Sequence, residues 1–272
     1  MRPKCKDLTS FSSGPNSQDR KADTPASFDA IKEKIAISIN NNVYHHGEAE
    51  ESLPAVKEGA QTFQQLLKER YGYEMLPETF FGPDEPFLEN KSSNLMGYLS
   101  LLLEKWKARQ GKGATVDRLV LYYHGHGVEV LGQPCLLTPD MEVIPMVELI
   151  NMVADHVISD RYYIITDCCA NKESVNETDK KRVEEALGVH QHKGLVEKIV
   201  NIRAVPGGYK ASSVKEKTLT SALVSVLEKS EKGIPLRKLK EKLREEQATQ
   251  GSRNHPDVNG SFSEGVDDLF PL

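Results

Sequence analysis

Apolar residues along this chain fall into short continuous runs that alternate with longer stretches of helical periodicity. Three runs are typical of buried strands, at residues 34–40, 117–123 and 161–166. Elsewhere apolar residues recur every three or four positions, which predicts amphipathic helices, at residues 53–71, 93–109, 146–156, 219–227 and 236–246. Strands that alternate with helices indicate a mainly parallel sheet with helices on both faces.

Weaker patterns complete this picture. Short strands are predicted at residues 78–81, 135–138 and 268–272, and ordered structure resumes at residues 197–204. Residues 252–265 are expected to form a polar loop, and the charge-rich residues 171–194 an exposed loop, because few apolar side chains are available to anchor them. The fold class we predict is α/β: a three-layer α-β-α sandwich whose mainly parallel central sheet has about six strands.

Composition limits the class of partner. The chain has 272 residues, and 38% of them are apolar, which suffices for a buried core. The formal net charge is −5, so electrostatics gives no reason to expect nucleic acid or an anionic membrane as the main partner. Every apolar run is far shorter than the roughly 18 residues that a membrane-spanning helix needs. A soluble protein is therefore predicted.

The N-terminal residues and the cysteines bear on compartment and domain organisation. The first 28 or so residues have no periodic apolar signal and lack the apolar segment of a secretion signal. The four cysteines, Cys5, Cys135, Cys168 and Cys169, are too few for a disulfide-stapled scaffold. We expect reduced thiols, a cytoplasmic location, a flexible leader at residues 1–30 and a single domain at residues 31–272.

Two polar clusters follow consecutive long strands. Residues 122–127 read Tyr-Tyr-His-Gly-His-Gly, and residues 166–170 read Thr-Asp-Cys-Cys-Ala. Because one helix separates the two strands, both clusters should meet at the carboxyl edge of the sheet, where ligands of such sheets bind. Thiol hydrolysis needs a nucleophilic sulfur, an imidazole and backbone donors for the oxyanion, and these clusters supply all three.

The same residues resemble the caspase-like cysteine peptidases, including metacaspases. Gly125-His126-Gly127 is similar to the Gly-His-Gly or Ser-His-Gly that supplies the base in that family, and Asp167-Cys168-Cys169 is similar to the Asp-Ser-Cys or Gln-Ala-Cys that supplies the nucleophile. Further segments resemble family elements in the same order along the chain: residues 53–60, 136–140, 204–209 and 218–227. The resemblance covers residues 33–272. It implies a large-subunit-like part at 31–170, a linker at 171–194 and a small-subunit-like part at 195–272.

The resemblance also implies roles for individual residues. Cys169 would be the nucleophile of a cysteine-type endopeptidase and His126 its partner, with the backbone N–H groups of Gly127 and Cys169 holding the oxyanion. Asp167, two residues before the nucleophile, would bind substrate, and its charge favours Arg or Lys over Asp at the P1 position. The Trp-Arg pair with which caspases bind an acidic side chain is replaced by the sequence of residues 209–213, Tyr-Lys-Ala-Ser-Ser.

Several alternatives stay open. His124 is a second candidate for the base, and Cys168 for the nucleophile, although adjacent strand residues face opposite ways and only one cysteine should enter a cleft. That alternation, with the lack of a Cys-x-x-Cys pair, argues against a zinc site, so no metal or cofactor is expected; calcium dependence is left open. Expected partners are protein or peptide substrates, and homodimerisation is undecided.

A different class of function is also compatible with the sequence. Ala170-Asn171 replaces the family's small residues after the cysteine, which usually end in glycine, so a weak or inactive caspase-like scaffold or binding module is the alternative. Within the expected linker, Lys180-Lys181-Arg182 would suit self-cleavage by a peptidase of basic specificity.

Overall fold

The computed structural model describes most of the chain from Glu33 onward. The described residues are 33–46, 49–82, 84–85, 88–89, 94–111, 115–169, 171–172, 176–188, 195–205, 211, 215–252, 254–260 and 269–271. The predicted leader and Cys5 lie outside them, as do residues 206–210. Residues from Lys32 to Leu272 form one compact unit.

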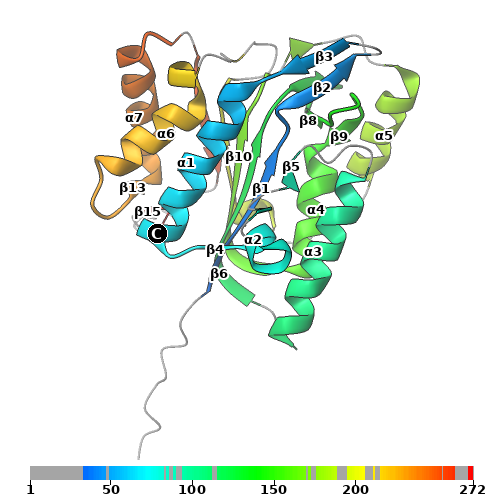
Figure 1. Ribbon diagram of the computed structural model, residues 1–272, viewed down its shortest axis with the longest axis horizontal. Coiled ribbons are helices and arrows are strands. Elements are labelled where there is room, and N and C mark those ends of the chain that lie inside the picture. The colour runs from blue at the N-terminus through cyan, green and yellow to red at the C-terminus, as the bar shows by residue number, and fades with distance from the viewer. Residues whose placement is uncertain are drawn as a thin grey trace, which may run out of the picture. The chain divides into compact units, whose positions relative to one another are not determined.

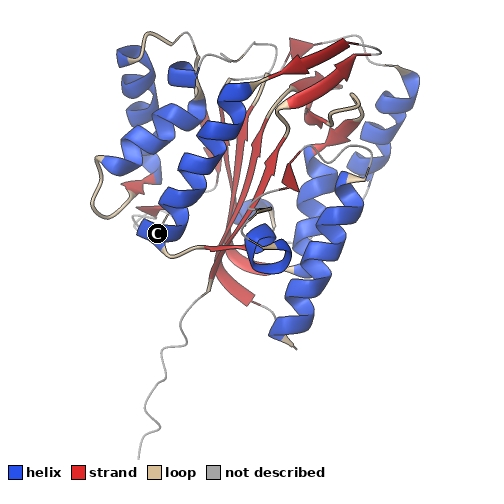
Figure 2. Cartoon of the chain, in the orientation of Figure 1, coloured by secondary structure: helices blue, strands red, loops and turns tan. Residues whose placement is uncertain are grey.

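The centre of this unit is a seven-stranded sheet (Figures 1 and 2). Its order is β14-β12-β10-β6-β1-β4, with the short β5 also paired to β1, and every pairing is parallel except that of β14 with β12. The bounds are β1 Lys34–Asn40, β4 Glu74–Met75, β5 Leu88–Glu89, β6 Thr115–His124, β10 Ile158–Asp167, β12 Ile199–Arg203 and β14 Asp257–Gly260. The three longest strands are the three that the apolar runs predicted.

Helices cover both faces of the sheet. On the left in Figure 1 lie α1 Pro54–Tyr71, α6 Leu219–Glu228 and α7 Leu236–Thr249; on the right lie α3 Leu95–Gln110 and α4 Met146–His156. Successive side chains of strand β6 face opposite sides of the sheet, and both sides are apolar. Val120 and Tyr122 belong to the apolar cluster under α1 and α6. Leu121 and Tyr123 belong to the cluster under α3 and α4. The predicted three-layer α/β fold is therefore confirmed.

Smaller elements complete the fold. A four-stranded sheet has the order β11-β7-β8-β9, with bounds β11 Asn171–Lys172, β7 Gly127–Val130, β8 Gln133–Leu137 and β9 Val143–Pro145. Strands β2 Val43–His46 and β3 Ala49–Ser52 form an antiparallel hairpin. Short 3-10 turns occupy Val196–Lys198 and Lys215–Lys217.

Three predicted elements differ from the structure. Residues 78–81 belong to a helix, α2 Leu76–Phe81, in which the buried Pro77 occupies the first turn, a position proline favours. The polar loop at 252–265 contains β14, which pairs with β12 and buries Val258. Strand β15 Leu269–Phe270 does form, but it pairs with β13 Ile234–Pro235 and not with the central sheet.

The charge-rich stretch at 171–194 is also more ordered than predicted. It contains α5 Glu177–Gly188, whose buried Val183 and Ala186 are three residues apart and so lie on one helix face. Asn176 begins the helix, since its Oδ1 accepts from the backbone N–H of Asp179 at 2.8 Å. Besides these two apolar residues, Arg182 of the same helix holds α5 in place through ion pairs with Glu148 and Glu142.

Candidate active site

The two polar clusters lie at the same edge of the central sheet, at matching positions in the register of their strands. Strands β6 and β10 are parallel neighbours, with His124 opposite Asp167 at their last pair. The backbone N–H of Gly125 then donates to the carbonyl of Asp167 at 3.3 Å. His126 and Cys169 each follow this last pair by two residues, so both chain segments leave the sheet side by side.

Gly127 permits the close approach of these two segments. A Cβ atom at this position would lie 2.6 Å from the Cys168 Sγ and 2.8 Å from the Cys169 carbonyl oxygen, closer than real Cβ contacts come. Beyond it the segments pair as strands β7 and β11, with Val128 opposite Asn171. Glycine beside the histidine is therefore required by packing against the cysteine pair.

Two tyrosines hold the backbone of His126. Its N–H donates to the Tyr44 hydroxyl at 2.6 Å, and the Tyr123 hydroxyl donates to its carbonyl oxygen. The two hydroxyls are 3.2 Å apart, and the Tyr44 ring centroid lies 4.4 Å from that of the imidazole. Burial raises the pKa of both tyrosines far above the ordinary value, so both stay neutral phenols.

The imidazole of His126 is 27% exposed and has a carboxylate partner. Its Nε2 lies 3.2 Å from the Glu51 Oε2, on strand β3 of the hairpin. Neither Glu51 nor Tyr44 is among the residues that the sequence singled out. The sequence signal for these residues is weak, because two strands of four residues each have no long apolar alternation.

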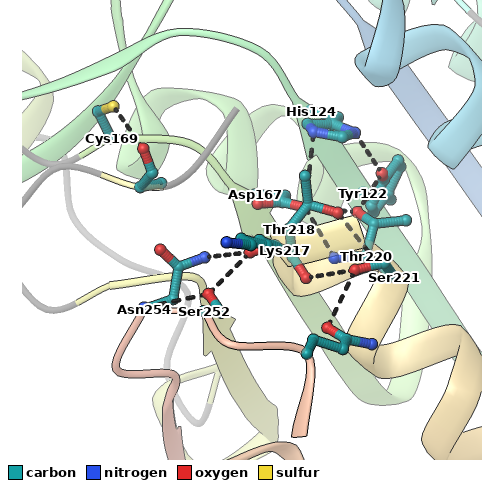
Figure 3. A network of polar contacts seen from close by, with 12 residues as sticks. Tyr122, His124, Asp167, Cys169, Lys217, Thr218, Thr220, Ser221, Ser252 and Asn254 are labelled. Carbon is teal, nitrogen blue, oxygen red and sulfur yellow. Dashed lines mark hydrogen bonds and ion pairs between the residues drawn. The ribbon is translucent and has the colours of Figure 1, made fainter. Parts of the chain in front are cut away.

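His124, the second candidate base, is buried away from solvent. Its Nδ1 is 3.0 Å from the Tyr122 hydroxyl, and its Nε2 is 3.5 Å from the Asp167 Oδ2 (Figure 3). Burial lowers the pKa of His124, with Asp167 acting in the opposite sense. The ring is thus a component of the interior, enclosed by Tyr122 and Asp167.

Asp167 is part of the same buried network. Only 2% of the residue is exposed. Its Oδ2 accepts from both the backbone N–H and the hydroxyl of Thr220, each at 2.7 Å (Figure 3). Because Thr220 is in the first turn of α6, where helix N–H groups lack intrahelical partners, the carboxylate ties the end of β10 to that helix.

The cysteines differ in surroundings. Cys169 directs its thiol at the carbonyl of Ala211, with 3.9 Å between Sγ and oxygen (Figure 3). The partly buried Cys168 packs against the apolar cluster under α3 and α4, and burial, reinforced by Cys169 and Asp167, raises its pKa far above the ordinary value. Cys135 is buried, and burial raises its pKa to about 12. Both Cys135 and Cys168 are therefore protonated thiols.

The described part of the chain contains no group of three or more His, Cys, Asp or Glu residues arranged to hold a metal ion. Within the same residues, no helix is both long enough and apolar enough to cross a membrane.

A cavity of about 20 Å³ adjoins the cysteine pair, lined by Glu129, Pro134, Cys135, Met146, Thr166, Cys168, Cys169, Arg203 and Val205.

Comparisons with known proteins agree with this architecture. The family model for the caspase domain of the C14 peptidases matches residues 33–261. Caspase-1 from Spodoptera frugiperda is similar in structure, with a TM-score of 0.56, 9% identity, and coverage of 86% of this chain and 90% of the other. A Geobacter sulfurreducens protein solved as a structural-genomics target has a TM-score of 0.56, 13% identity, and coverage of 84% and 92%. No curated protein matches the sequence significantly.

Proposed function

Because this chain belongs to the caspase-domain family of cysteine peptidases, we propose that it is an endopeptidase that acts through Cys169 and His126. The observation that carries the proposal is the register of β6 and β10, which brings the two residues to equivalent steps beyond a shared sheet edge. Gly127, packed against the Cys169 carbonyl, adds to it. A nucleophile and a base on adjacent segments are the arrangement that covalent thiol catalysis needs.

In the proposed reaction the Cys169 thiol gives its proton to His126 and the sulfur attacks the scissile carbonyl carbon. The C–S bond forms as the carbonyl π-electrons move to oxygen, where the N–H groups of Gly127 and Cys169 would receive the negative charge. Collapse breaks the C–N bond, and His126 protonates the leaving amine. Water, deprotonated by His126, then hydrolyses the thioester and releases the thiol.

The surroundings of the four candidate side chains support this choice among them. His124 is enclosed by Tyr122 and Asp167, whereas His126 reaches solvent. The raised pKa of Cys168 makes it a poor nucleophile, because the thiolate is the reactive form. We therefore retain His126 and Cys169.

The proposed P1 preference is Arg or Lys over Asp. The carboxylate that supports this preference is that of Asp167, which ends β10 two residues before Cys169. The Asp167 Oδ2 is engaged by Thr220, so Asp167 would act mainly through its charge and less through direct contact. Arg203 lines the cavity beside the cysteine pair, and its positive charge acts in the opposite sense. A substrate panel is therefore the decisive measurement.

The test is hydrolysis of fluorogenic peptides with Arg, Lys or Asp at P1, together with labelling by thiol-directed peptide probes. Cys169→Ala should abolish turnover and labelling, while Cys168→Ala, the matched control one residue earlier, should keep most of both. Loss of activity in Cys168→Ala with activity retained in Cys169→Ala would reverse the assignment. A preference for Asp peptides would overturn the proposed specificity.

An inactive binding module is the second candidate. The observation that favours it is the cavity beside the cysteine pair, which at about 20 Å³ holds little more than one water molecule. A folded protein that turns over none of the panel peptides would support this candidate. The cytoplasmic location expected from the sequence is likewise a proposal, supported by the thiols of Cys135 and Cys168, which form no disulfide.

A further inference from the structure

We infer that Glu51 is a positioning residue for His126, so that the proposed dyad works as a Cys169–His126–Glu51 triad. The inference rests on the proposed function, since it assigns a role through the candidate base. Its starting observation is the 3.2 Å distance between the Glu51 Oε2 and the His126 Nε2. Neither the family match nor the sequence motifs point to this carboxylate.

The hairpin that carries Glu51 is anchored at the site from its other strand. Glu51 lies directly opposite Tyr44 in the antiparallel pair of β2 and β3, so both side chains emerge on one face of the hairpin. Tyr44 is fully buried and accepts from the backbone N–H of His126. One hairpin face therefore fixes the backbone of His126 through Tyr44 and its ring through Glu51.

The contact between Glu51 and His126 would orient the imidazole. A carboxylate on Nε2 fixes the orientation and the tautomer of the ring, and Nδ1 is the nitrogen that remains to exchange a proton with the Cys169 thiol. The carboxylate also stabilises the imidazolium that forms when the thiol gives up its proton. The Glu51 side chain is 46% exposed, so the gain is moderate.

The other titratable groups near the ring do not supply this charge. Tyr44 from β2 and Tyr123 from β6 hold the backbone of His126, and their raised pKa values keep both neutral. Cys168 and Cys169 follow β10, and burial keeps Cys168 protonated. Among these groups, Glu51 is thus the one that places a negative charge at the imidazole.

The experiment compares Glu51→Gln with Glu50→Gln. Both variants remove one negative charge from β3, but Glu50 lies opposite His45 and so emerges on the other hairpin face. Glu51→Asp tests whether a shorter carboxylate restores function. The readouts are kcat and KM on the peptide panel, the dependence of kcat/KM on pH, and the rate at which iodoacetamide alkylates Cys169 at neutral pH.

Glu51→Gln should lower kcat two- to fivefold, equally for every P1 residue and with KM unchanged, as expected for a half-exposed ion pair. The dependence of kcat/KM on pH should differ from that of the wild type, because Glu51→Gln removes the charge next to the imidazole. Alkylation of Cys169 should slow by a similar factor, because less thiolate–imidazolium pair is present. Glu51→Asp should recover part of each loss, and Glu50→Gln should match the wild type.

Three other results would each overturn either the positioning role of Glu51 or the proposed peptidase activity. Equal alkylation rates and pH profiles in the wild type and Glu51→Gln would overturn the positioning role and leave the proposed peptidase in place. A higher KM confined to Arg and Lys peptides, with alkylation unchanged, would make Glu51 a substrate contact and overturn the inference. A wild type that cleaves no peptide, yet whose Cys169 alkylation depends on Glu51, would support the inference and overturn the peptidase.

Discussion

At the residue scale, two histidines that are only two positions apart have opposite surroundings. His126 faces the hairpin and is partly open to solvent, whereas His124 is enclosed by Tyr122 and Asp167. Burial disfavours the charged imidazole, so the interior holds His124 neutral. The network that His124 joins also includes Thr220, and through it the two strand ends are tied to α6.

The lowered pKa of His124 makes stability depend on pH. Below the ordinary value of 6.5 the unfolded chain takes up a proton at this position that the folded protein resists. Unfolding is therefore favoured as pH falls below about 6.5, and stability rises again as pH increases. His124→Gln should flatten this dependence in urea denaturation between neutral pH and pH values above the carboxylate range.

His45→Gln provides the matched control, because His45 is an exposed histidine of β2. It should leave the slope of stability against pH unchanged. An unaltered slope in His124→Gln would show that His124 does not resist protonation in the folded protein.

At the element scale, prediction from sequence succeeded where local periodicity was long. The helix predicted at 146–156 is α4 to the residue, and the strand at 34–40 is β1. Elements whose order comes from distant partners were missed. β14 has one buried apolar residue and depends on β12, while the β2–β3 hairpin depends on contacts of Tyr44 with Tyr123 and His126.

The residues of the candidate site also divide into those that local sequence patterns predict and those that depend on distant partners. The segments of His126 and Cys169 were predictable because each follows a strong apolar run, and parallel neighbours end at one edge. Glu51 was not, because a single carboxylate in a polar segment has no pattern of its own. Nor did the sequence show that Asp167 is buried against Thr220, since that contact joins residues far apart in the chain.

Helix α5 provides an element-scale prediction. Arg182 binds Glu148 through Nε at 2.9 Å and Nη2 at 3.0 Å, and it also contacts Glu142. Arg182→Ala should destabilise the protein by about 1 kcal/mol and speed amide exchange in α5. Hydrogen-exchange mass spectrometry should locate that change within residues 177–188.

Lys181→Ala is the control on the same helix. Its pair with Glu185 spans 3.7 Å on an exposed face and should contribute almost nothing. Equal exchange in both variants would mean that Arg182 does not anchor α5. The same anchor bears on self-cleavage after Lys180-Lys181-Arg182, because a scissile Arg182 would first have to leave both glutamates.

At the scale of the whole molecule, the parts before and after the expected linker share one core. The apolar cluster under α1 and α6 contains Phe63 and Val120 from the first part with Val200 and Leu223 from the second. Strands β10 and β12 join the two parts through a continuous parallel ladder of five residue pairs. The sheet and its core, more than the connecting chain, should therefore hold the molecule together.

Cutting the chain between α5 and residue 195 tests this expectation. A recognition site for a specific protease, inserted at residues 189–194, allows the chain to be cut at a position that contains none of the described ladder or core residues. The two fragments should elute together in gel filtration and keep the urea midpoint of the uncut variant within a small shift, because the buried apolar surface that supplies most of the stability is unchanged. Fragments that separate in native buffer would show that the linker, and not the shared core, maintains the assembly.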